Sequence, residues 1–421
     1  MNKYEKIVLS NKAPILTVPL LEAQTITALI IFKTGSRYET KETNGLSHFL
    51  EHMFFKGTVS RPSTLAIASD LDALGCEFNA FTGKEYTGYW IKSAKNKLSS
   101  ALEVLGDMLL NSKFDAAEID REKGVIIEEL NMYQDNPMLH IEDVLEACLY
   151  GDTPAGWETV GTKENIRRFT RQDFLDYFNS QYGANSAFMV LAGGVAPDHL
   201  VKAGEIMNQL KDNQWRDQEK NKYEQTEPKL LTAYKDIDQV NLSLAVRTFP
   251  LNHPEEFKVK LLAVILGGAM SSRLFINLRE RNGLAYYVKT STEFHSDSGY
   301  LTTQAGVPVD KVELSIEIIK REYAKLRNEL IPEAELTRAK DLLQGRLLLQ
   351  MEASDNLANW YARQLVQRPN IITPQDFIEK IKAITAQDLQ AIAQKIFVNE
   401  GLNLALIGKT NEQELLPLLN F

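Results

Sequence analysis

Residues 166–174 read IRRFTRQDF and residues 381–389 read IKAITAQDL, so that Ile, Thr, Gln and Asp recur at one constant separation. Each copy leads into an apolar segment that closes on glycine, SAFMVLAGG at residues 186–194 and LNLALIG at residues 402–408. Matching segments that follow one another in the same order indicate an internal duplication.

Two further pairs of segments extend this duplication. FDAAEIDREKGVIIEEL at residues 114–130 matches IPEAELTRAKDLLQGRL at residues 331–347, and TALIIFKTG at residues 27–35 is comparable to VNLSLAVRT at residues 240–248. Within each half, strand-like runs and helix-period stretches are intermixed without regular alternation. We therefore predict an α+β fold with two tandem homologous domains, each a mainly antiparallel sheet packed against helices.

A polar, charged segment at residues 210–229 separates the two halves and is almost free of aliphatic residues. Segments of this composition connect domains and do not form a core. We predict an N-terminal domain over residues 1–212, a linker over residues 213–229 and a C-terminal domain over residues 230–421.

Composition places the chain among ordinary globular proteins. Of its 421 residues, 44% are apolar and 24% are charged, and no uncharged apolar run is long enough to span a bilayer. The formal net charge of −9 argues against binding to nucleic acid or to an anionic membrane surface. The N-terminal residues lack the apolar core and cleavage site of a secretory signal, so we expect a cytoplasmic location.

The chain has two cysteines, Cys76 and Cys148. This number excludes both a disulfide framework and a zinc site built from thiolates. We expect both residues to be small members of the core.

The segment HFLEH at residues 48–52 places two histidines and a glutamate within five positions, in a chain with six histidines. In a helix over residues 46–54, His48 and His52 lie one turn apart with Glu51 beside them, so that two imidazoles can bind one metal ion. The alternative is a pair of surface or core histidines on an amphipathic helix. We favour the metal, because the neighbouring apolar residues form a separate stripe for the core.

A catalytic zinc ion needs a third protein ligand, and the acidic segment DREKGVIIEELNMY is the candidate source. Glu122 and Glu129 are two turns apart on one helix face, whereas Glu128 points about 100° away from Glu129. Acidic residues on a helix are more often a solvated face. The second copy, however, has Ala339 and Arg346 at the matching positions and no histidine in the region aligned with HFLEH, as expected if these residues form one site.

Four segments carry a resemblance to a known family: GSRYET (35–40), GLSHFLEHMFFKGT (45–58), FNAFTGKEYTGYW (78–90) and LGGAMSSRLFINLRERNGLAYYV (266–288). Together they resemble the inverzincins, which include pitrilysin, insulin-degrading enzyme and the mitochondrial processing peptidase. The chain is similar to the half-length bacterial branch and to the processing peptidase β subunit, in which two chains pair around an enclosed chamber. It differs from the non-catalytic processing-peptidase subunit, because the metal motif is intact and no extended glycine-rich loop is present.

The resemblance implies one zinc ion per chain, held by His48, His52 and Glu129, since the family's spacing from the second histidine to the third ligand ends at Glu129. It also implies that Glu122 is a second acidic residue that orients the site. Zinc with such ligands lowers the pKa of its water to about 7. Glu51 does not reach the metal comfortably and is expected to be the general base that acts on this water.

The resemblance also implies residues that hold substrate. The family has an arginine and a tyrosine seven residues apart in its C-terminal half, which serve the oxyanion and the peptide backbone. LRERNGLAYYV places Arg279 and Tyr286 at this spacing, with Tyr287 as the near alternative. The counterpart of CEFNAFTGKEYTGYW is an edge strand that pairs with substrate, and Asn79 and Ala80 are the matching positions.

We therefore expect a zinc-dependent endopeptidase that hydrolyses peptides or unfolded, presequence-like segments inside a chamber closed by a homodimer. Two alternatives belong to other classes. The chain could be a non-catalytic structural or peptide-binding subunit of a larger complex, although such relatives usually lose part of HxxEH. It could also be one half of an obligate hetero-oligomer, although the metal ligands and the Arg/Tyr pair on one chain make self-association sufficient.

Overall fold

The structure divides into two compact units, and neither is one continuous stretch of chain. It is a computed structural model that describes residues 4–20, 22–221 and 224–421, so residues 222 and 223 of the predicted linker lie outside the described residues. Unit 1 comprises Met1–Leu130, Glu158–Glu219 and Leu348–Ile372, and unit 2 comprises Asn131–Trp157, Lys220–Leu347 and Thr373–Phe421. The domain boundaries at residues 212 and 230 stay a prediction.

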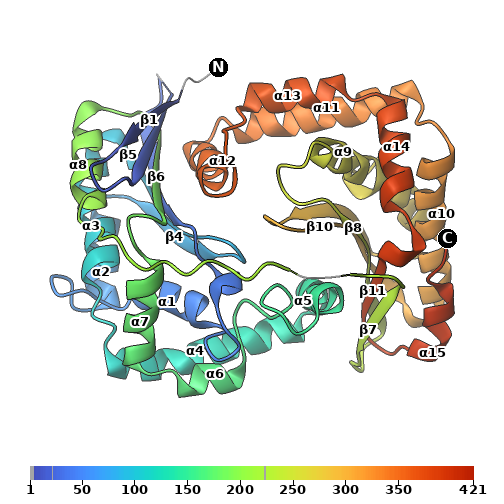
Figure 1. Cartoon of the computed structure of the whole chain (residues 1–421), viewed down its shortest axis with the longest axis horizontal. Helices are drawn as coiled ribbons and strands as arrows, with labels where there is room; N and C mark the ends of the chain where they lie inside the picture. Colours follow the sequence, from blue (N-terminus) through green and yellow to red (C-terminus); the bar gives the residue numbers. More distant parts are fainter. Residues whose placement is uncertain (1–3, 21, 222–223) are drawn as a thin grey trace. The chain divides into compact units, whose positions relative to one another are not determined.

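The sheet of unit 1 has the strand order β1-β2-β6-β3-β5-β4, so β4 is an edge strand (Figure 1). β2 and β6 run parallel, and the other neighbouring strands are antiparallel. The segment expected to be an edge strand forms the β4–β5 hairpin at one end of this sheet. The strands are β1 (Glu5–Val8), β2 (Pro14–Pro19), β3 (Thr25–Phe32), β4 (Glu77–Thr82), β5 (Thr87–Ala94) and β6 (Ala187–Gly193).

One face of this sheet is covered by helices that include α1, α3 and α7, and buried aliphatic and aromatic side chains form the core between them. The predicted helix over residues 46–54 is confirmed, because α1 has these bounds. The helices are α1 (Leu46–Phe54), α2 (Thr64–Ala73), α3 (Leu98–Asn111), α4 (Ala116–Asp135), α6 (Lys163–Arg168), α7 (Arg171–Gln181) and α8 (Pro197–Met207). The last turn of α4 lies beyond Leu130 and belongs to unit 2.

The opposite face of the unit 1 sheet is covered by α12 (Ser354–Gln367), which comes from the C-terminal half of the chain (Figure 1). Its buried side chains, among them Tyr361, share a core with Leu29 on β3 and Val190 on β6. The sheet of the N-terminal half is therefore covered on this face by a helix from the other half.

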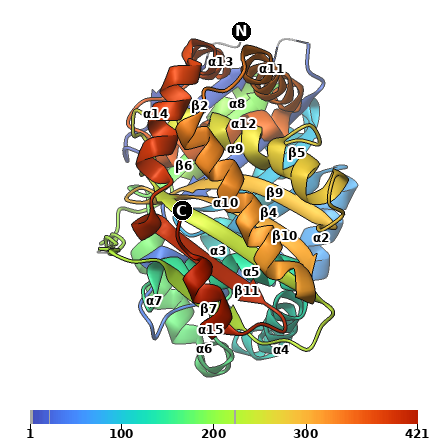
Figure 2. The same ribbon diagram turned by 90° about the vertical axis from the view of Figure 1, so that its right-hand side faces the viewer.

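The sheet of unit 2 has the order β7-β11-β8-β10-β9, with β7 and β11 parallel and the other pairs antiparallel (Figure 2). This order repeats β2-β6-β3-β5-β4 of unit 1. The strands are β7 (Lys229–Ala233), β8 (Gln239–Thr248), β9 (Tyr287–Phe294), β10 (Gly299–Pro308) and β11 (Leu402–Ile407). The same topology in both units is the structural counterpart of the duplication in the sequence.

Helices cover both faces of the unit 2 sheet as well. α9, α10 and α14 pack on one face, where Figure 2 shows α10 and α14 in front of the strands. The opposite face is covered by α5 (Pro137–Tyr150) from the N-terminal half, whose Leu145 and Leu149 share a core with Tyr300. The other helices are α9 (Glu256–Gly267), α10 (Val312–Asn328), α11 (Glu333–Gln350), α13 (Pro374–Ala383), α14 (Ala386–Ile396) and α15 (Glu412–Leu415).

The Thr and Asp of the repeated segment begin equivalent helices. Thr170 is the N-cap of α7, and its backbone N–H donates to Asp173 Oδ2 at 2.7 Å. Thr385 is the N-cap of α14, and its backbone N–H donates to Asp388 Oδ2 at 2.9 Å. Both pairs form capping boxes, in which two backbone groups at the helix start are satisfied reciprocally. The repeated Thr and Asp therefore start a helix at the same point of each unit.

The α+β fold with two homologous parts is confirmed, since each unit is a mainly antiparallel sheet packed against helices. In the part of the chain that the structure describes, none of the helices has both the length and the apolar character needed to cross a membrane.

Candidate active site

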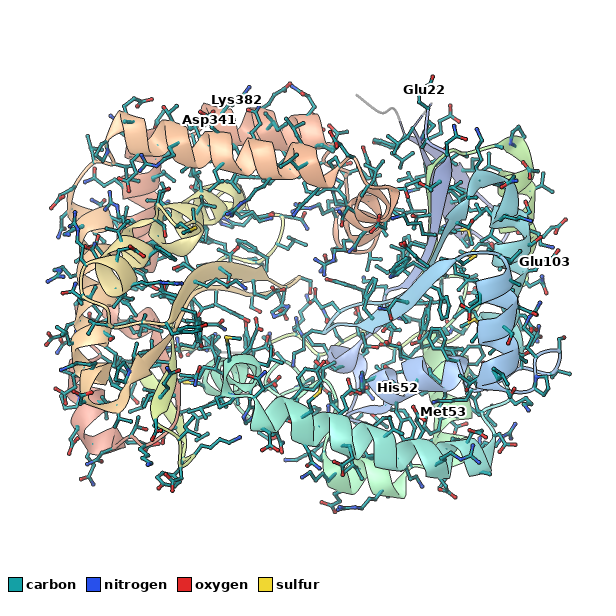
Figure 3. All side chains as sticks on the ribbon, turned by 180° about the vertical axis from the view of Figure 1, so that it is seen from behind. Glu22, His52, Met53, Glu103, Asp341 and Lys382 are labelled. Atoms are coloured by element: carbon teal, nitrogen blue, oxygen red, sulfur yellow. The ribbon has the colours of Figure 1, made fainter. Side chains whose placement is uncertain are left out.

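The two histidines lie on α1, a helix whose start depends on glycine. Gly45 precedes the helix with φ 100°, and a Cβ atom there would lie 2.6 Å from the carbonyl oxygen of Val160. Along α1, Met53 is buried in the core, whereas the adjacent His52 points toward α4; both residues are labelled in Figure 3. The apolar stripe predicted for this helix is confirmed, because its members Phe49, Leu50, Met53 and Phe54 are all buried.

The structure brings both histidines to one acidic residue of α4. His48 Nε2 lies 3.7 Å from Glu129 Oε1, and His52 Nε2 lies 3.4 Å from Glu129 Oε2. One donor atom from each of the three residues lies within 4.8 Å of the other two. The neighbouring Glu128 is exposed. Of the two adjacent glutamates, Glu129 is therefore the one placed to share a metal ion with the histidines.

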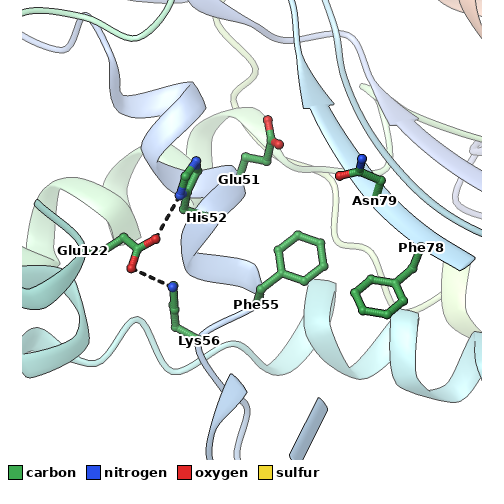
Figure 4. Close-up of a pocket in the computed structure, with 7 residues that line it drawn as sticks. All are labelled: Glu51, His52, Phe55, Lys56, Phe78, Asn79 and Glu122. Atoms are coloured by element: carbon green, nitrogen blue, oxygen red, sulfur yellow. Dashed lines mark hydrogen bonds and ion pairs between the residues drawn. The ribbon is translucent and has the colours of Figure 1, made fainter. Parts of the chain in front are cut away.

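Glu122 lies on the other side of the His52 ring (Figure 4). Its Oε1 is 2.9 Å from His52 Nδ1, and its Oε2 is 2.6 Å from Lys56 Nζ. A carboxylate at Nδ1 keeps the proton of a neutral imidazole on that nitrogen and leaves Nε2 as the electron-pair donor. Glu122 thus has the position of a residue that orients a metal ligand.

The imidazoles and carboxylates of this group shift one another's pKa values. Burial opposes a charge on His52, but hydrogen bonds to Glu122 and Glu129 prevail and raise its pKa to about 9. Hydrogen bonds from His48 and His52 hold the pKa of Glu129 well below its usual range. Burial opposes ionisation of Glu122, yet its bonds to His52 and Lys56 lower the pKa of this carboxyl. Both carboxylates are therefore ionised at neutral pH and suit a cation.

Glu51 lies near these donors but is hydrogen-bonded to a different element. Its Oε2 accepts a hydrogen bond from Thr82 Oγ1 on β4 at 2.5 Å. Burial raises the pKa of Glu51, while the bond from Thr82 and the nearby histidines oppose the rise. A carboxyl with a raised pKa beside a group of candidate metal ligands has the properties of a residue that exchanges protons.

A pocket opens beside these groups (Figure 4). Phe55 and Phe78 form an aromatic part, with ring centroids 6.2 Å apart and an interplanar angle of 24°. The polar part is supplied by α1, α4 and β4. The lining residues are Glu51, His52, Phe55, Lys56, Phe78, Asn79 and Glu122. The pocket therefore joins an apolar surface directly to the cluster of acids and imidazoles.

The predicted substrate residues Asn79 and Ala80 lie on the edge strand β4, and Asn79 Oδ1 accepts a hydrogen bond from Ala80 N–H at 2.8 Å. The structure places Arg279 and Tyr286 in unit 2, and both side chains are exposed. Arg279 belongs to a π-helical turn, Phe275–Glu280. The assignment of these four residues to substrate stays a prediction.

Tyr287 differs from its neighbour Tyr286 in burial and in the hydrogen bond of its hydroxyl group. Its hydroxyl donates a hydrogen bond to Asn241 Oδ1 at 2.8 Å, and burial raises its pKa to about 12. Tyr286 is 77% exposed. Of the two adjacent tyrosines, Tyr286 is therefore the one with an available hydroxyl.

At the positions of unit 2 that match Glu122 and Glu129, the chain has Ala339 and Arg346. α9 takes the place of α1, and Arg346 of α11 takes the place of Glu129. Arg346 Nη1 donates to the carbonyl oxygen of Gly268 at the end of α9, at 2.8 Å. In unit 2, this hydrogen bond links α11 to the end of α9.

Sequence reasoning did not identify Thr82, Lys56, Phe55 or Phe78 as parts of the site. Phe55 and Lys56 directly follow α1, so their nearness to the histidines could have been expected. Thr82 gave a weaker signal, namely its position two residues after Ala80 on a predicted strand. Its contact with Glu51 depends on how β4 packs on α1, which the sequence does not state.

Two imidazoles and one carboxylate around one point, beside a further carboxylate, are the donor set of catalytic zinc sites in metallopeptidases. The donors fit zinc in kind, since both nitrogens that face Glu129 are Nε2 atoms and the acid is ionised. The fold and the site together thus define the class of protein, a metal-dependent hydrolase built from duplicated α+β units.

Comparisons with known proteins agree with this class. Residues 16–163 match the family described as Insulinase (Peptidase family M16), and residues 168–343 match the description Peptidase M16 inactive domain. A protein of Rickettsia felis named an uncharacterized zinc protease is 35% identical over 399 residues, covering 92% of this chain and 94% of the relative. A Bacillus subtilis protein, also named an uncharacterized zinc protease, is 34% identical over 375 residues, which cover 89% of this chain and 91% of the relative. The chain belongs to the insulinase family of peptidases, family M16.

Solved structures share the fold. A protease from Helicobacter pylori superposes with a TM-score of 0.91 at 22% identity, covering 97% of this chain and 100% of the other. A structure from Pseudomonas fluorescens described as a peptidase M16 inactive domain superposes with a TM-score of 0.88 at 20% identity. The match covers 97% of this chain and 99% of the other. The family resemblance drawn from the sequence motifs is confirmed, and the names of the relatives support a peptidase function.

Proposed function

We propose that the protein is a zinc-dependent endopeptidase. The observation that carries this proposal is the convergence of His48, His52 and Glu129 on one point, with Glu51 beside them and bonded to a different element. A second carboxylate with a raised pKa next to an open pocket supports a catalytic role for this site.

His48, His52 and Glu129 would hold one zinc ion per chain, and Glu122 would keep the His52 ring in the orientation and tautomer that metal binding needs. When bound, zinc supplies a Lewis acid that favours hydroxide over water at neutral pH and polarises a peptide carbonyl. Glu51 would take a proton from the attacking water and later deliver it to the leaving amine of the peptide.

The substrate would be an extended peptide or an unfolded, presequence-like segment. β4 is an edge strand, so its free side can pair with the backbone of a substrate strand beside Asn79 and Ala80. The aromatic pocket next to Glu51 would receive a substrate side chain. Backbone pairing with one such pocket predicts broad sequence tolerance with a preference near the cleaved bond.

A homodimer would close the chamber around the substrate, with Arg279 and Tyr286 contributing donors for the oxyanion. Their support is their exposure in unit 2 and the family spacing. Light scattering should give a mass of about two chains at micromolar concentration. A stable monomer with full activity would contradict the dimer.

Zinc analysis together with hydrolysis of a quenched peptide library tests the main proposal. We expect about one zinc ion per chain and metal-dependent cleavage that a chelator abolishes. Glu51→Gln should keep the zinc and lose nearly all turnover, because Gln cannot accept the proton. Peptide binding without hydrolysis by the zinc-loaded wild-type chain would favour the non-catalytic, peptide-binding alternative.

A further inference from the structure

Thr82 holds the carboxylate that is proposed as the general base. Its hydroxyl donates to Glu51 Oε2 at 2.5 Å. Within residues 4–20, 22–221 and 224–421, no other side chain donates a hydrogen bond to Glu51. We propose that Thr82 is a positioning residue for Glu51, an inference that rests on the function proposed above.

The direction of the Thr82 side chain is set by the pleat of β4. Side chains two residues apart on a strand share one face. Phe78 and Ala80 pack against the core on the α1 side of the sheet, and Thr82 is the next residue on that face. Phe81 packs into the core on the opposite face, beneath α12. The hydroxyl therefore reaches Glu51 from a strand that is anchored on both faces.

The end of β4 is also held from behind. The backbone N–H groups of Ser36 and Arg37 donate to the carbonyl oxygens of Gly83 and Lys84, at 3.1 and 2.9 Å. In the same turn, Glu85 Oε1 lies 2.7 Å from Arg37 Nη1, and both side chains are almost fully buried. Moving the turn would require this buried ion pair to separate, which is costly. The strand end is thus a rigid support for the hydroxyl.

This support has a chemical consequence. A carboxylate that acts as a base must present one oxygen to the water in a reproducible position. With Oε2 of Glu51 held by Thr82, Oε1 is left to accept the proton. Without the hydroxyl, the carboxylate rotates about its terminal bonds, and the productive arrangement is populated for less of the time.

The test compares variants of the full zinc-loaded chain. Thr82→Val removes the hydroxyl and keeps the shape, and Thr82→Ser keeps the hydroxyl. Thr25→Val is the matched control, because it makes the same chemical change at an exposed position. Since general-base catalysis contributes about 10² to 10⁴ in rate, we expect Thr82→Val to lower kcat about 10-fold or more with unchanged KM. Thr82→Ser and Thr25→Val should keep the wild-type kcat.

A second readout does not depend on activity. Crystal structures of zinc-free wild type and Thr82→Val should show the Glu51 carboxylate in one position in the first and in more than one in the second. Thr82→Ala provides a further removal of the hydroxyl if valine disturbs the packing of β4, and it should behave in the same way.

The possible outcomes separate this inference from the proposed function. A wild-type kcat in Thr82→Val and Thr82→Ala would overturn the inference, as would a change confined to KM, which would assign the hydroxyl to substrate binding. Loss of zinc in these variants would also overturn it, because a positioning residue of Glu51 leaves the ligands in place. A wild-type chain without peptidase activity, or a fully active Glu51→Gln variant, would overturn the proposed function instead.

Discussion

At the scale of single residues, His52 uses its two ring nitrogens for different purposes. Nδ1 lies 2.9 Å from Glu122, and Nε2 lies 3.4 Å from Glu129. The first contact fixes the ring, and the second brings the nitrogen to the acid with which it would share a metal ion. In the proposed zinc site, Glu122 would therefore affect how tightly the metal is bound without touching it.

Replacing this residue should weaken zinc binding without removing a ligand. Glu122→Gln is expected to lower zinc affinity about 10- to 100-fold, because Gln is a weaker acceptor for the His52 proton. Competition with a chelator measures the change. Glu128→Gln is the control, since Glu128 is an exposed glutamate of the same helix and should have no effect. Equal affinities for Glu122→Gln and wild type would contradict the role assigned to Glu122.

The two adjacent tyrosines of unit 2 give a second prediction. Tyr286→Phe should lower kcat about 10²-fold, the usual loss for one oxyanion donor, with zinc content and thermal stability unchanged. Tyr287→Phe should instead lower stability, because it leaves buried Asn241 without its hydroxyl partner. Steady-state kinetics and thermal melts of both variants distinguish the two effects. The assignment is wrong if Tyr286→Phe retains the wild-type kcat.

At the scale of elements, α1 is held at its start by a carboxylate from outside the helix. Glu39 is almost fully buried, and its oxygens accept hydrogen bonds from the N–H groups of Gly45 at 2.9 Å and Ser47 at 2.6 Å. The Asn44 side chain donates to the same carboxylate at 3.2 Å. N–H groups at a helix start have no partner within the helix, and negative charge there is favourable. Glu39 thus fixes the turn from which His48 projects.

Glu39 should make stability depend on pH in a definite direction. Burial raises its pKa from 4.5 to about 7, although the N–H donors oppose the rise. Between these values the folded chain binds a proton that the unfolded chain has released, so the free energy of unfolding falls as pH rises. The loss amounts to about 3 kcal/mol across the window.

Chemical denaturation of the zinc-free protein at several pH values measures this effect. Relative to Glu39→Gln, the wild type should lose stability from about pH 4.5 to about pH 7. Glu42→Gln, an exposed glutamate of the same loop, serves as the control and should follow the wild type through this window. A constant difference between wild type and Glu39→Gln at every pH would contradict the raised pKa.

At the scale of the whole molecule, the two halves exchange equivalent helices. α12 follows α11 as α5 follows α4, and each of the two packs on the sheet formed by the other half of the chain. Thr27 Oγ1 and Ser354 Oγ, 327 residues apart, form a buried hydrogen bond of 2.8 Å. Neither half of the sequence therefore contains all of one compact unit.

This exchange predicts how fragments behave. Residues 1–219 alone should lack a cooperative thermal transition, because Leu29 and Val190 lose the cover of α12. The same fragment with residues 348–372 joined by a flexible linker should regain it. In the full chain, Tyr361→Ala should cost about 3 to 5 kcal/mol, as expected for a large buried aromatic residue. Circular dichroism melts measure each case, and a cooperative melt of residues 1–219 alone would contradict the prediction.

Several features of the fold and site were predictable because they are local. The helix at residues 46–54 agrees with its stripe of apolar residues, and the presence of two homologous units follows from the repeated segments. The acids of α4 were predicted as a pair because seven residues are two helical turns. Choosing Glu129 over Glu128 needed either the family spacing or the structure, since both residues belong to one acidic segment and only their surroundings differ.

The duplication, the α+β class and the cluster HFLEH could be predicted from the sequence, because spacing and periodicity are properties of consecutive residues. The tertiary structure alone decided which strand orients Glu51, how Glu39 holds α1 and which half of the chain supplies α5 and α12. These features join residues such as Thr82 and Glu51, or Thr27 and Ser354, through packing and hydrogen bonds across long loops. No local pattern encodes such contacts, because each depends on the combined burial of many side chains.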